Sequence, residues 1–129
     1  MKQCIADAKE QGDINGLLHC VGSIVIRPPH ALNKDAFEEV ITTNLTSAFL
    51  ALSIAGKAML RQGKGRMVFS SSVAGSLGLV NHEAIAAAKG GIEAMVRSSA
   101  ATYARRGLRI NAVAPCLLYT SELPTIYSV

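Results

Sequence analysis

Three side chains that could take part in chemistry follow one another between residues 72 and 89 of this sequence. An apolar run, 66–71, leads into a cluster of serines that ends at Ser72, and a segment of small residues downstream carries Lys89. His82 precedes Lys89 by seven residues, almost two helical turns, so both fall on one stripe of a helix. A hydroxyl can bind a substrate oxygen, an ammonium supplies positive charge, and an imidazole can donate a proton near neutral pH. These are side chains that proton transfer at a substrate oxygen can use.

Alternating strand and helix patterns must position these side chains. Short apolar runs bounded by turn residues predict buried parallel strands, and i, i+3, i+4 spacing of apolar residues predicts the helices between them. The alternation predicts an open parallel α/β sheet. The predicted strands are 16–21, 66–71 and 108–113, and the predicted helices are 2–11, about 33–61 with Asn33 or Asp35 as its cap, and 82–106 with Asn81 as its cap.

The loops after these strands predict where a ligand binds. In parallel α/β sheets, ligands lie at the carboxyl ends of the strands. Each predicted strand is followed there by a polar or glycine-containing loop, namely Gly22-Ser23, Ser71-Ser72 and Ala114-Pro115. The three loops are therefore expected to form one binding site, although this argument applies to any sheet of this kind.

Composition excludes several classes of protein. The chain has 129 residues, enough for at most one domain, and half of its residues are hydrophobic. Its net charge of +4 is scattered and it has no tryptophan, so we expect no nucleic-acid surface. No stretch of about 18 uninterrupted apolar residues occurs, so no membrane span is expected. The three cysteines lack C-x-x-C spacing, so we expect them to be free thiols in a reducing, cytoplasmic compartment. The histidines have no partners at ligand spacing, so no metal site is expected.

The order of these motifs resembles the short-chain dehydrogenase/reductase family. That family has a serine, a tyrosine thirteen residues later and a lysine four residues after the tyrosine. Ser72 and Lys89 match this register, and Asn44 matches the family's asparagine that holds a water near the lysine. Gly22 matches the last residue of the family's Asn-Asn-Ala-Gly run, and 109–115 resembles the strand that leads into its Pro-Gly loop. The resemblance implies a partial, doubly wound Rossmann-type sheet in three α/β/α layers that binds NAD or NADP.

The resemblance also implies roles for individual residues. Ser72 would polarise a substrate oxygen, Lys89 would bind the cofactor ribose, and Asn44 would hold the relay water. Gly22 and Pro115 would lie against the cofactor, and Thr120 falls where the family's threonine meets the nicotinamide amide or phosphate. The parent protein would act on a small carbonyl or alcohol as a homodimer or homotetramer.

The central departure from the family is Ile85, which stands where the acid/base tyrosine belongs. Isoleucine cannot move a proton. Enoyl-acyl-carrier-protein reductases, a related group, space their tyrosine and lysine by seven, and His82 occupies that position here. His82 or water is therefore the candidate proton donor. A surface histidine beside a helix cap is the simpler interpretation of His82.

Two further departures concern the extent of the chain. The family's glycine-rich pyrophosphate loop has no counterpart, so residues 1–129 are expected to be an incomplete NAD(P)-binding domain. Segment 116–129 drifts from family character and is a candidate for non-native sequence, in which case the match of Thr120 is accidental. We expect a fragment of an oxidoreductase that is inactive alone. The alternative is a non-catalytic nucleotide-binding or regulatory relative, which Ile85 favours.

Overall fold

The computed structural model describes residues 2–116, and these form one parallel sheet with helices against it. The sheet contains β1 (Gly16–His19), β2 (Gly65–Ser70) and β3 (Leu108–Val113) in that order. All neighbouring strands are parallel, with His19 opposite Phe69. The predicted parallel α/β sheet is confirmed, but β1 is shorter than expected and ends before Cys20.

The helices differ from prediction in two details. The predicted helix 33–61 is continuous but contains a π-helical turn, and Asn33 is its cap because its side chain accepts a hydrogen bond from Ala36 N at 2.8 Å. Asn81 was predicted to cap the last long helix, which was wrong: His82 is the cap residue and Asn81 has a φ of 60°. The helical elements are α1 (Lys2–Glu10), η1 (Pro29–Ala31), α2 (Lys34–Ile41), η2 (Thr42–Thr46), α3 (Ser47–Gln62), η3 (Val73–Gly75), α4 (Glu83–Tyr103) and η4 (Ala104–Arg106).

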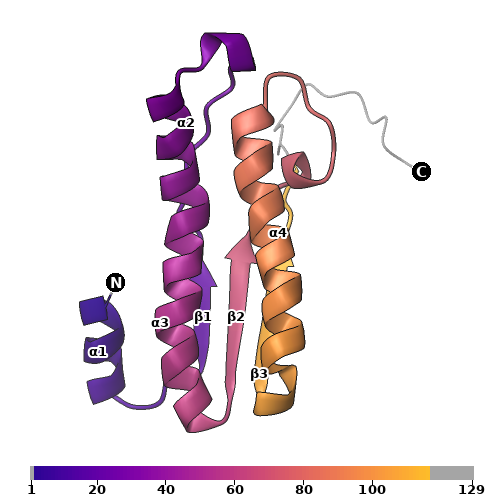
Figure 1. The fold of residues 1–129 in the computed structure, drawn as a ribbon. Helices are drawn as coiled ribbons and strands as arrows, with labels where there is room; N and C mark the ends of the chain where they lie inside the picture. Colours follow the sequence, from indigo (N-terminus) through magenta and orange to yellow (C-terminus); the bar gives the residue numbers. More distant parts are fainter. Residues whose placement is uncertain (1, 117–129) are drawn as a thin grey trace, which may run out of the picture.

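Both long helices cover the same face of the sheet, as Figure 1 shows. Connections between parallel strands are right-handed. Because the chain passes from β1 to β2 to β3 in one direction across the sheet, both connecting helices lie on the same face. Within residues 2–116 the arrangement therefore has two layers of the predicted three. The opposite face carries Leu18 and Val113, whose side chains are 67% and 50% exposed.

The core lies between α3, α4 and the covered face of the sheet. Alanines at 48, 51 and 55 of α3 are buried, and their small size lets the helix approach the strands closely. Phe69 and Met67 of β2 are completely buried beneath the helices. This packing fixes the height of both helices above the carboxyl ends of the strands.

The helical segment 34–62 is long and apolar enough to cross a membrane by length and composition alone. Its most apolar window has a mean hydropathy of 1.2, and 39% of that window is buried inside the protein. Core helices that pack on a sheet pass the same test. The segment's buried residues belong to the core described above.

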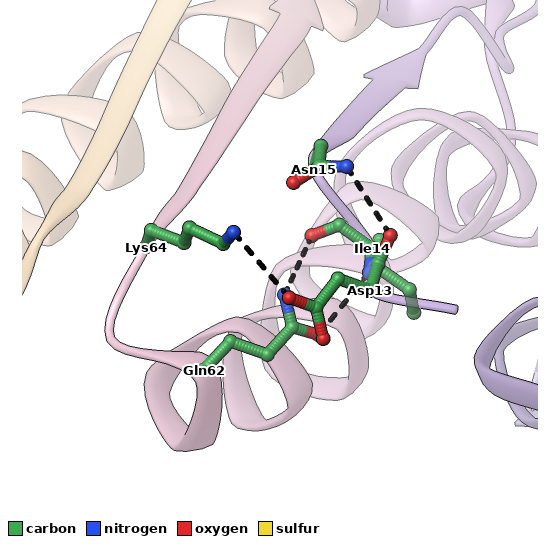
Figure 2. Close-up of polar contacts among 5 residues, drawn as sticks. All are labelled: Asp13, Ile14, Asn15, Gln62 and Lys64. Carbon is green, nitrogen blue, oxygen red and sulfur yellow. Dashed lines mark hydrogen bonds and ion pairs between the residues drawn. The ribbon is translucent and has the colours of Figure 1, made fainter.

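A polar cluster fastens the edge strand β1 to the end of α3, as Figure 2 shows. The side-chain amide of Gln62 accepts a hydrogen bond from Ile14 N at 3.2 Å and donates one to Ile14 O at 3.0 Å. Lys64 and Asp13 form an ion pair at 3.4 Å beside it. Because Gln62 satisfies both backbone groups of Ile14, it acts as a substitute for a neighbouring strand at the start of β1.

Candidate active site

Ser72 begins a tight turn that packs against α4. Its backbone is extended, and its hydroxyl oxygen accepts a hydrogen bond from Ala74 N at 3.2 Å, which starts η3. Two glycines allow the close approach: a Cβ on Gly75 would lie 2.9 Å from Gly90 N, and one on Gly90 would lie 3.1 Å from Gly75 O. The contact holds the Ser72 turn beside the helix that carries Lys89, at the end of the sheet where α4 begins (Figure 1).

Ser71 has a different role from Ser72, one that the sequence analysis did not predict. The buried Ser71 hydroxyl donates to Glu93 Oε1 at 2.7 Å and lies 3.2 Å from the carbonyl oxygen of Lys89. It therefore ties the end of β2 to α4. A usable signal was present, because Glu93 follows Lys89 by four residues and shares its helical stripe.

Three of the predicted site residues line a single pocket together with Ile85. Ser72, His82, Ile85 and Pro115 surround a cavity of about 110 Å³ at the carboxyl ends of the strands. Apolar side chains dominate the remainder of the wall, and one thiol contributes to it. These other lining residues are Ile24, Val73, Ala74, Leu79 and Cys116.

Larger hollows, four of them among the described residues, lie away from Ser72 and Pro115. One of about 560 Å³ lies between α3 and α4 near Tyr103 and Arg106, and one of about 490 Å³ lies at the amino ends of the strands near Arg66 and Arg109. Neither contains a predicted site residue. We assign the site to the smaller pocket because ligands of parallel α/β sheets bind at the carboxyl ends of the strands.

Lys89 lies beside that pocket, over the ends of β1 and β2. Its Nζ donates a hydrogen bond to Ser70 O at 2.8 Å. A Cβ on Gly22 would lie 3.4 Å from Nζ and 2.8 Å from Asn44 Oδ1, so glycine allows the loop after β1 to pack closely against both side chains. The structure thus brings together Gly22, Asn44 and Lys89, which lie far apart in the sequence.

Asn44 is completely buried within the π-helical turn η2, a type of turn that often occurs at functional sites. Its side-chain oxygen accepts from Ser23 N at 3.2 Å, and its amide donates to Val40 O at 2.9 Å and contacts Ser23 O at 3.2 Å. The side chain therefore clamps the loop after β1 onto the helix. Its predicted contact with a relay water stays a prediction.

Burial sets the charge balance of the site. The side chain of Lys89 is only 8% exposed, and burial lowers the pKa of its amine, while the nearby Cys20 thiol opposes that shift. Burial and then the positive charge of Lys89 lower the pKa of His19. Among the described residues, Lys89 uses one of its three N–H donors. Its other two donors are suited to a polar ligand.

His82 projects into the same pocket as Ser72 from the first turn of α4. Its Nδ1 lies 2.6 Å from Val80 O, so Nδ1 carries the hydrogen and Nε2 is the ring nitrogen left for other partners. It makes no side-chain cap hydrogen bond. Ser72, His82 and Ile85 therefore line one pocket, and the catalytic roles of Ser72 and His82 stay predictions. Thr120 lies outside the described residues.

Comparison with known proteins identifies the family. The model of the enoyl-(acyl carrier protein) reductase family matches residues 1–128. A crystal structure of a short-chain dehydrogenase/reductase from Burkholderia xenovorans superimposes with a TM-score of 0.87 at 33% identity, over 92% of this chain and 48% of that one. The chain belongs to the short-chain dehydrogenase/reductase family, as the motif order predicted.

Named relatives include both a reductase and an inactive protein. Levodione reductase from Leifsonia aquatica is 40% identical over 93 residues, which are 72% of this chain and 35% of that protein. The inactive 2-(S)-hydroxypropyl-CoM dehydrogenase 2 of Xanthobacter autotrophicus is 30% identical over 112 residues, which are 87% of this chain and 49% of that protein. The chain thus spans half or less of the length of these relatives.

Proposed function

We propose that this chain is part of an NAD(P)-dependent oxidoreductase that interconverts a small carbonyl compound and its alcohol. The observation that carries the proposal is the meeting of Ser72 and Ile85 in one pocket, with Lys89 one turn further along α4. This is the geometry expected of a site in which a serine hydroxyl binds the reacting oxygen. The largely apolar pocket wall supports a small substrate with few polar groups.

Ser72 is suited to polarise the substrate oxygen. Its oxygen already accepts a hydrogen bond from Ala74 N, which fixes the side chain, and its own hydrogen remains available to donate into the pocket. A donor held in place before the reaction stabilises negative charge on the oxygen without reorganisation. The clamp of Ser71 on Glu93 keeps this part of the chain against α4.

The residues present fit a nicotinamide cofactor. Gly22 lets the loop after β1 approach Lys89 closely, and the two remaining donors of Lys89 would suit the hydroxyl groups of a ribose. Pro115, at the end of the third strand's loop, forms the other wall. When bound, the cofactor supplies or accepts hydride. Lys89 holds it in register with the pocket and contributes positive charge.

Proton transfer needs a group other than residue 85, because Ile85 is apolar and buried. His82 is the candidate that lines the same pocket, with Nε2 free of the contact to Val80. If His82 donates the proton, His82→Ala lowers kcat and changes the pH–rate profile. An unchanged rate and profile would exclude His82 as the donor.

The second candidate function is nucleotide binding without turnover, which Ile85 favours. A relative that is inactive by name shows that likeness within this family does not by itself establish activity. The full-length protein, expressed from the complete reading frame, decides between the two. Turnover of small ketones with NADH or NADPH, reduced at least about 100-fold in Ser72→Ala and unchanged in the exposed-turn control Ser76→Ala, supports the enzyme.

Ile85→Tyr tests the alternative directly. The substituted phenol would enter the adjacent cavity from a buried position on α4. If the natural protein binds NAD(P) but reduces nothing until residue 85 is tyrosine, the natural function is binding or regulation. If the natural protein already turns over, the enzyme proposal holds and the proton donor lies elsewhere.

The remaining features of the parent are proposals that rest on surface chemistry. Phe49 and Leu50 on the outer side of α3 are 55% and 47% exposed, which supports burial against another copy in a homodimer or homotetramer. The mass of the full-length protein by light scattering tests this. The free, exposed thiols Cys4, Cys20 and Cys116 support a reducing, cytoplasmic location, which cell fractionation tests.

A further inference from the structure

His19 is a buried histidine to which neither the motif order nor the pocket assigns a role. It ends β1, is only 4% exposed, and its ring lies 5.8 Å from that of Phe69, centroid to centroid. Its Nε2 lies 3.2 Å from Ser47 Oγ. Because Ser47 Oγ donates its own hydrogen to Thr43 O, it must accept from His19, so the hydrogen of the neutral ring is on Nε2.

The other ring nitrogen has no matching partner. Nδ1 of His19 is buried and makes no hydrogen bond to any residue in the range 2–116. In the neutral ring it is an acceptor with one lone pair. A buried acceptor without a donor costs about 1–3 kcal/mol, so such atoms normally receive a hydrogen bond from the protein or from a buried water.

Lys89 supplies donors at the same place. Its Nζ is bound to Ser70 O, and Ser70 directly follows Phe69, the residue opposite His19 in the sheet. On the other side, Nζ lies against Gly22, three residues beyond His19. The ammonium therefore lies over the ends of β1 and β2, and two of its N–H groups have no acceptor among the described residues.

The charges around the imidazole agree with this proximity. Lys89 lowers the pKa of His19, second to burial, so its charge is close to the ring. Ser47 from α3 and Phe69 from β2, which contact the ring, carry no charge, and the backbone of His19 itself opposes the lowering of its pKa. The Cys20 thiol, next in the chain, lies near Lys89. The unpaired acceptor, His19 Nδ1, and the unpaired N–H donors of Lys89 Nζ therefore lie in the same small region.

We propose that His19 is a positioning residue for Lys89, whose Nζ donates to His19 Nδ1 through one buried water molecule. This bridge holds the ammonium beside Gly22 and leaves one of its donors for a ligand. Ser47 fixes the tautomer that makes Nδ1 an acceptor. The proposal concerns the described chain itself and does not depend on turnover, so it can fail or succeed independently of the oxidoreductase proposal.

The test is the titration of the Lys89 amine, followed by the NMR signals of its Cε and Nζ in the full protein. His19→Phe retains packing against Phe69 but removes the acceptor, and we expect the Lys89 midpoint to fall by about one pH unit because a charge-assisted hydrogen bond is lost. His19→Gln retains an acceptor and should stay near the natural midpoint. The exposed His30→Gln is the control. An unchanged or raised midpoint in His19→Phe overturns the proposal.

A second measurement needs no His19 variant and covers the case in which His19→Phe fails to fold. Long-range nitrogen–proton NMR of the imidazole should show hydrogen on Nε2 of His19, with a Nδ1 resonance that moves when Lys89 is deprotonated at high pH. In Lys89→Met the Nδ1 resonance should lie where an unbonded acceptor lies. A Nδ1 resonance that shifts neither on deprotonation of Lys89 nor in Lys89→Met would falsify the contact.

Discussion

At the scale of single residues, the adjacent serines Ser71 and Ser72 have different roles in this site. Ser71 is buried and bonded to Glu93, whereas Ser72 keeps a free hydrogen in the pocket. Successive residues of an extended chain point to opposite sides, so only one of the two can face a ligand. Ile85 lines the pocket at the position where the resemblance predicts the acid/base tyrosine, and this correspondence stays a prediction.

The buried ammonium of Lys89 should make stability depend on pH in the alkaline range. Its pKa is lower in the folded protein than the 10.5 of an exposed lysine, so the unfolded chain binds more protons in the interval between the two values. The free energy of unfolding therefore rises with pH through that interval, by up to about 1.4 kcal/mol per pH unit. Urea unfolding of the natural protein and of Lys89→Met, from about pH 8 to about pH 10, measures the difference.

A flat difference between the two proteins across that range would contradict the buried charge. Lys57→Met is the matched control, because Lys57 lies on the exposed side of α3. This control should follow the natural protein at every pH.

At the scale of elements, α4 organises the site and two glycines set its distance from η3. Ile85, Lys89 and Glu93 follow one another at intervals of four along one side of this helix. They face the pocket, the strand ends and the serine turn, respectively. A change in the contact between η3 and α4 should therefore alter both stability and the position of Ser72.

Gly75→Ala should destabilise the protein by about 1–3 kcal/mol, because its Cβ would lie 2.9 Å from Gly90 N and 3.0 Å from the Lys89 carbonyl carbon, both backbone atoms. Gly78→Ala is the control, since nothing lies within 4 Å of a Cβ there. Thermal or urea unfolding compares the two. Equal stabilities would show that η3 moves freely away from α4.

The attachment of β1 to α3 depends on a single side chain. Gln62→Ala leaves both backbone groups of Ile14 without their hydrogen bonds, so we expect a loss of about 1–3 kcal/mol in the free energy of unfolding. Gln11→Ala, at an exposed position after α1, should change stability by less than about 0.5 kcal/mol. Faster amide exchange at the start of β1 in Gln62→Ala, but not in Gln11→Ala, would locate the effect.

At the scale of the whole molecule, the sheet has one covered and one uncovered face among residues 2–116. Both crossovers place their helices on the same side, and the other side presents Leu18, Val68 and Val113 on three adjacent strands. In the longer relatives the chain continues beyond the matched part. An apolar sheet face and its edges without cover promote association with other chains.

The 129-residue chain should therefore associate as its concentration rises. Leu18→Thr, which retains a strand-forming residue, should reduce that association, because Leu18 is 67% exposed on the uncovered face. Val80→Thr, in an exposed loop at 82%, is the control and should leave it unchanged. Light scattering over a range of concentrations measures both. A monomer at all concentrations would show that this face does not mediate contact.

The sequence by itself determined the class of fold and the family, and it drew attention to Ser72, His82, Ile85 and Pro115, which line the pocket. Apolar runs and helical periodicity are local properties that can be recognised in the sequence. The spacing of Ser72, Ile85 and Lys89 can be recognised there too, because these residues lie at the end of one strand and on the helix that follows it. Only the tertiary structure decided the rest. The contact of Gly75 with Gly90, the bond of Ser71 to Glu93, and the place of His19 beside Lys89 each join segments that are separate in the chain. Such contacts depend on how closely helices approach a sheet, which is set by the packing of the whole core rather than by local pattern.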